Sequence, residues 1–278
     1  MKLDDLQAYH KHLTDTYDAR STSHDKSDWH RKTSLKLLDE LPPEPNDWIL
    51  DIGTGTGTIA FQVASIIGRH GKVIGVDLSK GMLEQARKKL AASNYHNIEF
   101  TQGDMERLEL PENTFDKIYC ASAFFCVLDP QQTLRHWYSL LKPGGCLGFH
   151  AIPESSYFWV SIARDILEQR GFQYLLNSPT GTINKTTQLL EKAGFSDIDI
   201  RVVETGYYIP LEKAQQTWIH RDSFAPGQYP HPLHSIPDNI LKECQEEYER
   251  RIETLNTEQG VWNDISMYYV YVCKPKSA

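Results

Sequence analysis

The chain is short of cysteine and lacks long apolar runs, and both features narrow what it can be. It holds five cysteines in 278 residues, and none forms a C-x-x-C pair. Four of them lie in or near apolar runs (Cys120, Cys126, Cys146 and Cys273), so we expect buried free thiols rather than disulfides or a metal site. No apolar run approaches the length of about 18 residues that a membrane span needs, and the polar N-terminus has no signal-like core. We therefore expect a cytoplasmic protein without membrane insertion.

Positive charge is also scarce. The chain has 29 Lys and Arg against 37 Asp and Glu, a formal net charge of -8, and its longest basic run is Arg87-Lys88-Lys89. Nucleic acid is therefore not an expected partner. The length is ample for one catalytic domain with an insertion, and we expect a monomer or a homodimer that acts on a small molecule.

Strand-like and helix-like segments alternate along the middle of the chain. This alternation predicts an α/β fold with a doubly wound, mostly parallel sheet. The expected strands are 48–52, 72–77, 97–101, 115–121, 145–150, 197–203 and 267–273, and the expected helices are 57–68, 80–92, 130–141 and 182–193.

Two further segments flank this core. Residues 1–44 are predicted to form N-terminal helices, and residues 45–205 with 267–278 the core. The intervening segment 206–266 is far longer than a minimal connection, and its loop carries Pro, His and aromatic residues. We interpret it as a helical lid over an acceptor substrate, with a packing extension as the alternative.

The stretch WILDIGTGTG, from Trp48 to Gly57, predicts a strand that ends in a tight glycine loop. Gly53, Gly55 and Gly57 let the backbone approach a ligand at the start of a helix. A dinucleotide fingerprint needs its third glycine where this chain has Thr58. The loop therefore disfavours an NAD-dependent oxidoreductase.

Two acidic residues follow this loop at informative positions. Asp77 ends the second strand, twenty residues beyond Gly57, where a carboxylate can accept both hydroxyls of a ribose. Asp104 follows the third strand and is placed to accept the exocyclic amine of an adenine, while Met105 covers the ring. Each feature is weak by itself, and together they indicate an adenosyl site.

On these motifs the chain resembles the class I S-adenosylmethionine-dependent methyltransferases. LDIGTGTG, VIGVDLSKGMLEQA, QGDMERLELPENTFDKIYCASAF and LKPGGCLGF are similar to segments of the ubiquinone and menaquinone biosynthesis methyltransferases, closely over residues 45–150 and loosely elsewhere. The resemblance implies S-adenosylmethionine as cofactor, S-adenosylhomocysteine as product, and a seven-stranded sheet whose last strand is antiparallel. It also implies cofactor contacts to the methionine part, ribose, adenine and sulfonium from Asp51, Gly53, Gly55, Gly57, Asp77, Leu78, Met82, Asp104, Met105 and Ser122.

Simpler roles exist for several of these residues. Met82 shares a helix face with core positions, Ser122 could simply end a strand, and Asp51 could only cap the loop amides. An N-terminal helix closes over the cofactor in similar proteins, which makes Tyr17, Trp29 and His30 candidates too. Packing on the sheet is an equal alternative for Trp29.

Proton transfer and acceptor binding have less distinct signals. His150 ends the fifth strand at the ligand-binding edge, and His231 lies in the predicted lid, so either could accept a proton. Arg221, Tyr229 and Trp262 of the insertion are candidate acceptor contacts. We predict no metal site, because the histidines have no carboxylate or cysteine at ligand spacing.

The function predicted first is O-methylation of an enolic or phenolic hydroxyl on a small ring. A less specific similarity, in YDARSTSHDKSDWHRK and ASAFF, points to cyanobacterial enzymes that methylate a gadusol-type cyclohexenone in mycosporine biosynthesis. The alternatives are C-methylation of a quinone precursor or lipid, and a non-catalytic protein that binds the cofactor and regulates.

Overall fold

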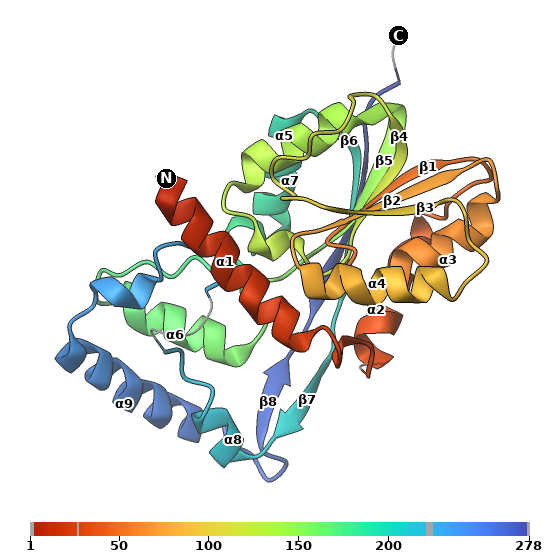
Figure 1. Ribbon diagram of the computed structural model, residues 1–278. Coiled ribbons are helices and arrows are strands. Elements are labelled where there is room, and N and C mark those ends of the chain that lie inside the picture. Colours follow the sequence, from red (N-terminus) through yellow and green to blue (C-terminus); the bar gives the residue numbers. More distant parts are fainter. Residues whose placement is uncertain (1–2, 27, 221–224, 277–278) are drawn as a thin grey trace.

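Within residues 3–26, 28–220 and 225–276, which the computed structural model describes, a seven-stranded sheet forms the centre of the molecule (Figure 1). Its order is β3-β2-β1-β4-β5-β9-β6, and β9 runs antiparallel to both neighbours while the other strands are parallel. The strands are β1 (Trp48–Ile52), β2 (Lys72–Asp77), β3 (Ile98–Gln102), β4 (Phe115–Cys120), β5 (Leu141–Ala151), β6 (Ser196–Val203) and β9 (Met267–Cys273). This confirms the predicted fold, including the antiparallel last strand.

Helices cover both faces of the sheet. They are α1 (Leu3–Arg20), α2 (Asp28–Glu40), α3 (Thr58–Ile67), α4 (Lys80–Ala91), α5 (Pro130–Leu140), α6 (Phe158–Glu168), α7 (Ile183–Ala193), α8 (Leu211–Gln215) and α9 (Asp238–Thr254), with short turns η1 (His24–Lys26), η2 (Phe124–Cys126), η3 (Ser178–Thr180) and η4 (Pro232–Ser235). One core packs α5 and α7 on the sheet, and another packs α2, α3 and α4 on the opposite face. A parallel sheet needs this double cover because both of its faces are apolar.

Local sequence explains where several of these helices begin and end. The Ser79 hydroxyl accepts a hydrogen bond from the Met82 N–H and caps α4, and the Asp129 carboxylate does the same for the Gln132 N–H at the start of α5. Gly194, with φ of 101°, ends α7 in the left-handed region. The predicted boundaries of these helices agree with the structure to within one residue.

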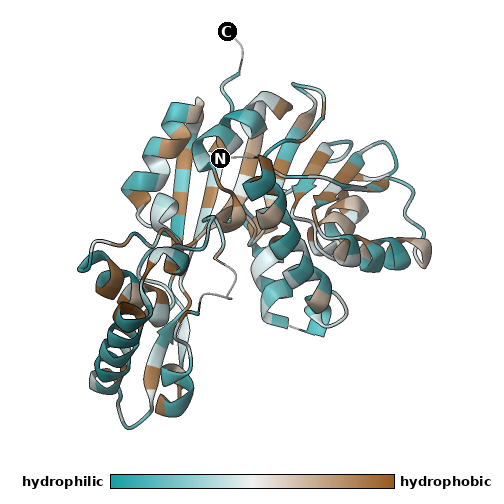
Figure 2. Cartoon of the chain, turned by 60° about the vertical axis from the view of Figure 1, so that its left-hand side comes forward, coloured by the Kyte–Doolittle hydropathy of each residue, from teal (hydrophilic) through white to brown (hydrophobic). Residues whose placement is uncertain are grey.

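The insertion 206–266 forms part of a third core. It contains a two-stranded sheet of β7 (Gly206–Ile209) and β8 (Val261–Asp264), with α8 and α9 beside it (Figure 1). Its buried residues pack on α6 of the preceding segment, and the Trp218 and Tyr248 rings lie 5.2 Å apart. The sequence analysis missed α6, β7 and β8. Figure 2 shows this part of the chain, with its alternating apolar and polar residues, below the sheet.

The thiol prediction was wrong for two cysteines. Cys146 on β5 and Cys273 on β9 are directly opposite in the antiparallel register, with Cα atoms 4.1 Å apart, and form a disulfide. The two are 127 residues apart in the chain, so only strand pairing reveals them as partners. The other three cysteines, Cys120, Cys126 and Cys244, are buried and free.

No helix among the described residues is long and apolar enough to cross a membrane.

We expect the third core to depend on Arg164. Its buried guanidinium donates to three backbone carbonyls, those of Glu154 (3.0 Å), Tyr174 (3.3 Å) and Leu176. Arg164→Leu removes all three donors and leaves buried acceptors unpaired, which should lower the free energy of unfolding by about 3–5 kcal/mol. Chemical denaturation measures this change.

Arg135→Leu, on the exposed face of α5, is the matched control and should change stability by less than about 0.5 kcal/mol. Equal effects of the two substitutions would show that the buried hydrogen bonds of Arg164 are not what stabilises this core.

Candidate functional site

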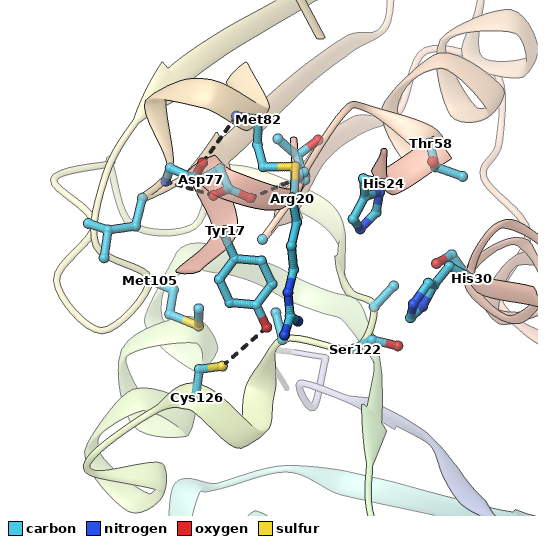
Figure 3. Close-up of a pocket in the computed structure, with 18 of the residues that line it drawn as sticks. Tyr17, Arg20, His24, His30, Thr58, Asp77, Met82, Met105, Ser122 and Cys126 are labelled. Carbon is cyan, nitrogen blue, oxygen red and sulfur yellow. Dashed lines mark hydrogen bonds between the residues drawn. The ribbon is translucent and has the colours of Figure 1, made fainter. Parts of the chain in front are cut away.

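A cavity of about 400 Å³ opens at the carboxyl ends of β1, β2 and β4. The chain runs from β1 outward to β2 and β3, and then returns to β4 and β5 on the other side of β1. Loops after β1 and β4 therefore diverge and leave a crevice between them, which is where open α/β sheets bind ligands. Helix α1 crosses the mouth of this crevice (Figures 1 and 3).

The glycine loop forms one side of the cavity. Gly53, Gly55 and Gly57 have φ of 65°, 55° and 89°, values that side chains with a Cβ rarely adopt. A Cβ on Gly53 would lie 2.5 Å from the Cβ of Ala123, so a side chain does not fit at this point, the base of the crevice where the two loops come close before they diverge. Beside Gly55, by contrast, the nearest atom to such a Cβ is 3.9 Å away, on His24, and this open space is suited to a ligand.

Asp77 ties the end of β2 to the glycine loop. Its carboxylate accepts hydrogen bonds from the Gly55 N–H (2.8 Å) and the Ser79 N–H (2.9 Å). Burial raises the pKa of this carboxyl group. Each carboxylate oxygen can accept a further bond, so Asp77 can still receive hydroxyl donors from the cavity that it lines.

Asp51 lies deeper, at the end of β1. One of its oxygens accepts from the Thr54 hydroxyl (2.6 Å) and from the Ala60 N–H (3.2 Å). Burial raises the pKa of Asp51 to about 7, with Asp77 adding to the effect. Asp51 thus holds the start of α3 and the glycine loop by hydrogen bonds, and its side chain also lines the cavity.

The predicted adenine contacts divide into two groups. Leu78, Met82 and Met105 line the cavity, and so does Cys126. Asp104 does not line it. Its carboxylate instead accepts the Glu106 N–H (2.9 Å) and lies 3.5 Å from the His10 imidazole of α1.

Helix α1 is fixed over the cavity at two points. The Tyr9 hydroxyl donates to the Cys126 carbonyl (2.6 Å) and accepts from the Gly227 N–H (2.8 Å), so it joins core, helix and insertion. At the other end of the helix, Asp18 accepts the Gly81 N–H (2.9 Å) at the start of α4. This placement brings the inner face of α1 into the site.

Tyr17 and Arg20 of α1 both face the cavity (Figure 3). The Tyr17 hydroxyl lies 3.9 Å from the Cys126 sulfur, and this neighbour, together with burial, keeps the pKa of Tyr17 well above its usual value. The phenol is therefore neutral. The Arg20 guanidinium lies 5.9 Å from the Tyr17 ring and introduces a positive charge.

Two histidines stand beside these residues. The imidazoles of His24 and His30 are stacked, with centroids 5.6 Å apart and an angle of 13° between the ring planes (Figure 3). The Trp29 ring contacts His30 edge-on at 4.9 Å. Burial lowers the pKa of His30, and the charges of His24 and Arg20 lower it further. Trp29 and His30, both candidates for cofactor contact, line the cavity.

Ser122 and His150 form a hydrogen-bonded pair at the ends of β4 and β5. The Ser122 hydroxyl and His150 Nδ1 are 3.1 Å apart, and Ser122 has a left-handed φ of 53°. Ser122 lines the cavity, whereas His150 lies beneath it, buried against the Tyr269 ring at 4.5 Å. Burial lowers the pKa of His150 to about 3, and its Nε2 atom has no hydrogen-bond partner among the described residues. His150 therefore stays neutral at ordinary pH and does not reach the acceptor directly.

The insertion residues predicted to contact the acceptor lie elsewhere. Tyr229 packs against Tyr9, with ring centroids 6.3 Å apart, and Trp262 lies on the exposed β8 beside Tyr208. His231 is buried and accepts the Leu233 N–H. None of the described residues of 206–266 lines the cavity, so these aromatic contacts belong to packing. Arg221 and Phe224 lie outside the described residues.

Sequence reasoning also missed several residues of the cavity. They are Arg20, His24, Ile152, Tyr157 and Met267. The 13, 17, 20 spacing of Leu13, Tyr17 and Arg20 on one helix face was a usable signal for Arg20. Ile152 and Tyr157 follow β5 at the same sheet edge as the other strand ends, whereas nothing local marks Met267.

Comparison with known proteins agrees with this geometry. Residues 49–145 match a family described as a methyltransferase domain. The chain is 31% identical to a demethylmenaquinone methyltransferase of Symbiobacterium thermophilum over 217 residues, 70% of this chain and 86% of that protein. A C-methyltransferase of ubiquinone and menaquinone biosynthesis from Hahella chejuensis is 34% identical over 119 residues, 42% of this chain and 48% of its own length. The chain thus spans most of the first relative and about half of the second.

Solved structures share the fold. A methyltransferase-like protein of Bacillus halodurans superposes with a TM-score of 0.56 at 20% identity and covers 88% of this chain and all of that one. A Haemonchus contortus phosphoethanolamine N-methyltransferase, solved with S-adenosyl-L-methionine, gives 0.54 at 18% identity, covering 88% of this chain and 53% of that one. At 18–20% identity, these structural similarities show that the chain shares the fold of these proteins, and they show only the fold.

Sequence identity over most of a relative's length and the seven-stranded topology lead to the same result. The chain belongs to the class I S-adenosylmethionine-dependent methyltransferases, and it is related to the demethylmenaquinone methyltransferases.

Proposed function

We propose that the protein transfers a methyl group from S-adenosylmethionine to a ring carbon of a small acceptor that carries an ionisable hydroxyl group. The observation that carries this proposal is the Ser122 hydroxyl, held by His150 and exposed in an otherwise largely apolar wall of the cavity. Such a wall suits a ring, and a hydroxyl group on it suits a ring oxygen.

The methylated atom is proposed from the relatives. One of the two relatives is named a demethylmenaquinone methyltransferase, and the other is named a C-methyltransferase of ubiquinone and menaquinone biosynthesis. This support favours the carbon-methylating alternative over the O-methylation that the sequence first suggested. Nothing in the cavity or among the relatives favours a gadusol-type acceptor in particular.

The cavity has a chemically suitable group for each part of the cofactor. We propose that Asp77 receives the ribose hydroxyls and that Leu78, Met82 and Met105 enclose the adenine. The open space beside Gly55 would admit the methionine part, with its ammonium near Asp51. Arg20, on the facing helix, would pair with its carboxylate. Asp104 reaches the adenine only if its contact with His10 changes.

Six of the other lining residues form what we call the acceptor wall. They are Trp29, Ser34, Ser122, Ile152, Tyr157 and Met267. When bound, S-adenosylmethionine supplies a methyl group on a sulfonium, which a nucleophile must approach in line. The apolar members of the wall would hold the ring flat and exclude water. Ser122 would orient it through the oxygen, and His150 would hold the Ser122 rotamer as a neutral positioning residue.

Product analysis tests the proposed function. The protein is incubated with S-adenosylmethionine and 1,4-naphthohydroquinone, kept reduced with dithionite, and 1,4-dimethoxynaphthalene is the control without an ionisable hydroxyl. We expect methylation of the hydroquinone at a ring carbon, shown by mass and by NMR, and none of the diether. A methyl ether as the product would restore the O-methylation reading, and no product from hydroxylated rings would overturn both.

The ribose role predicts a loss of affinity in Asp77→Asn. The substitution keeps the size of the side chain but removes the charge and one acceptor oxygen. S-adenosylhomocysteine should bind about 10–100-fold more weakly, about 1.5–3 kcal/mol, as measured by calorimetric titration. Asp197→Asn, on the outer strand β6, should leave binding unchanged. If Asp77→Asn binds normally, the residue serves only to brace the glycine loop.

The Asp51 carboxyl predicts a pH dependence of cofactor binding. Its pKa of about 7 in the free protein means that it is mostly protonated below neutral pH. A nearby ammonium favours the ionised form, so binding releases a proton, and the affinity for S-adenosylhomocysteine should rise from pH 5.5 to 7 and level off above that. The rise should approach tenfold per pH unit at the acid end.

Asp51→Asn cannot lose a proton, so its affinity should vary much less over the same range. Calorimetry in buffers of different ionisation enthalpy measures the released proton directly. The same pH slope in Asp51→Asn and in the unchanged protein would assign the linkage to another titratable group of the cavity.

A further inference from the structure

Methyl transfer from a sulfonium to a neutral acceptor produces one proton for every turnover, and that proton must leave a cavity built to exclude water. We propose that His30 is the general base that takes this proton from the acceptor, and that a second hollow behind α2 and α3 is its exit to solvent. The inference rests on the proposed function, because it requires an acceptor with an ionisable hydroxyl.

The second hollow has a volume of about 430 Å³ and adjoins the reaction cavity. Four residues border both spaces: His24, His30, Ser34 and Thr58. Arg31, Gln62 and Ser65 line only the outer hollow and are exposed, so it opens at the surface. His30 therefore stands at the boundary between the acceptor and bulk water.

Position separates His30 from the other histidines considered for this role. His24 and His30 are the histidines that line the cavity in the described part of the chain. His150 lies under the floor behind Ser122, and His231 caps a turn in the insertion. His30 and Ser122 both line the cavity (Figure 3), so an acceptor that fills it and contacts Ser122 shares the cavity with the His30 ring.

The charges around His30 suit a base that must release its proton again. The His24 ring stacks on it from η1, and Arg20 faces it from α1; both repel a second positive charge, and burial adds to the effect. These three causes lower the pKa of His30, so the imidazole is neutral near pH 7 and can accept a proton. Proton loss to the outer hollow then follows readily.

The outer hollow has its own charged groups. Asp25, beside His24 at 3.9 Å, pairs with Lys89 at 2.6 Å and accepts from the Thr56 hydroxyl. Lys89 and Thr56 hold the pKa of Asp25 below its usual value despite partial burial, so it stays ionised. This carboxylate, close to His24, partly offsets the positive charges of the hollow and eases passage of a cation.

The step balances as follows. The acceptor hydroxyl gives its proton to a ring nitrogen of His30, and the electron pair left on oxygen is delocalised onto the ring carbon. That carbon forms a bond to the methyl group as the methyl–sulfur bond breaks, and the electron pair stays on sulfur. The ring then loses the hydrogen of the methylated carbon and the oxygen regains a proton. The net products are the methylated acceptor, S-adenosylhomocysteine and one proton, which leaves through the outer hollow.

Kinetics with 1,4-naphthohydroquinone as the acceptor test the role of His30. His30→Gln should lower kcat at pH 6.5 by about 100-fold or more, while the affinity for S-adenosylhomocysteine changes less than about threefold. The defect should shrink as the pH rises toward the pKa of the acceptor hydroxyl, because an ionised acceptor needs no base. His70→Gln, in the exposed turn that follows α3, is the matched control and should behave like the unchanged protein.

Chemical rescue tests the exit. Imidazole added to His30→Ala should restore part of the activity, and adding Ser65→Trp at the rim of the outer hollow should abolish that rescue. Rescue that survives Ser65→Trp would place the route elsewhere and overturn the exit. A His30→Gln protein that keeps kcat within threefold, or that loses affinity for S-adenosylhomocysteine instead, would overturn the base.

An NMR titration keeps this inference separate from the proposed function. In the free protein, the His30 ring should titrate reversibly with a pKa below 6.5, and His24→Gln should raise that pKa. A His30 ring that does not titrate between pH 4 and 8 overturns the inference whatever the acceptor. If His30 titrates as expected but the unchanged protein methylates no hydroxylated ring, the fault lies with the proposed function, and the role of His30 as its base falls with it.

Discussion

The site depends on one pairing arrangement, in which β1 pairs with β2 along one edge and with β4 along the other. Because the chain leaves β1 in one direction and returns on the opposite side, the loops after β1 and β4 separate and expose the backbone between them. The strand-end groups that we assign to the site follow from that arrangement: the glycine loop at β1 and Asp77 at the end of β2 for the cofactor, and Ser122 just after β4 for the acceptor. The site for methyl transfer is thus placed at the carboxyl ends of the parallel strands, where the cavity opens.

Closure of this crevice is supplied by an element distant in the sequence. Helix α1 contacts the core through Tyr9 and Asp18, and these two contacts at its ends set how Tyr17 and Arg20 face the cavity. The insertion takes part only indirectly, because its Gly227 N–H meets the Tyr9 hydroxyl. Its influence on the acceptor would therefore pass through the position of α1, and its buried aromatic residues Trp218 and Tyr248 belong to the core shared with α6.

Acidic and basic side chains lie on different sides of the cavity, an arrangement that suits a ligand such as S-adenosylmethionine, which carries positive groups and a carboxylate. The buried carboxyl groups, Asp51 and Asp77, lie at the ends of β1 and β2, whereas Arg20, His24 and His30 lie on the helical side. Two imidazoles at the same site behave differently for a physical reason. His150 is enclosed by apolar groups and stays neutral, whereas His30 borders two hollows and can exchange a proton.

The sequence by itself determined the sheet, the glycine loop and the position of Asp77, because these follow from local rules: apolar runs, helix caps, and the backbone freedom of glycine. It also named Met82, Met105, Trp29 and His30 as candidate cofactor contacts, and all four line the cavity. Tertiary structure decided the rest. The Cys146–Cys273 disulfide, the Ser122–His150 pair and the second hollow beside His30 each join residues from separate elements. The same reason explains why Tyr229, His231 and Trp262 do not line the cavity. The insertion could bury its apolar face either over the crevice or against α6, and only packing in three dimensions selects between these two arrangements.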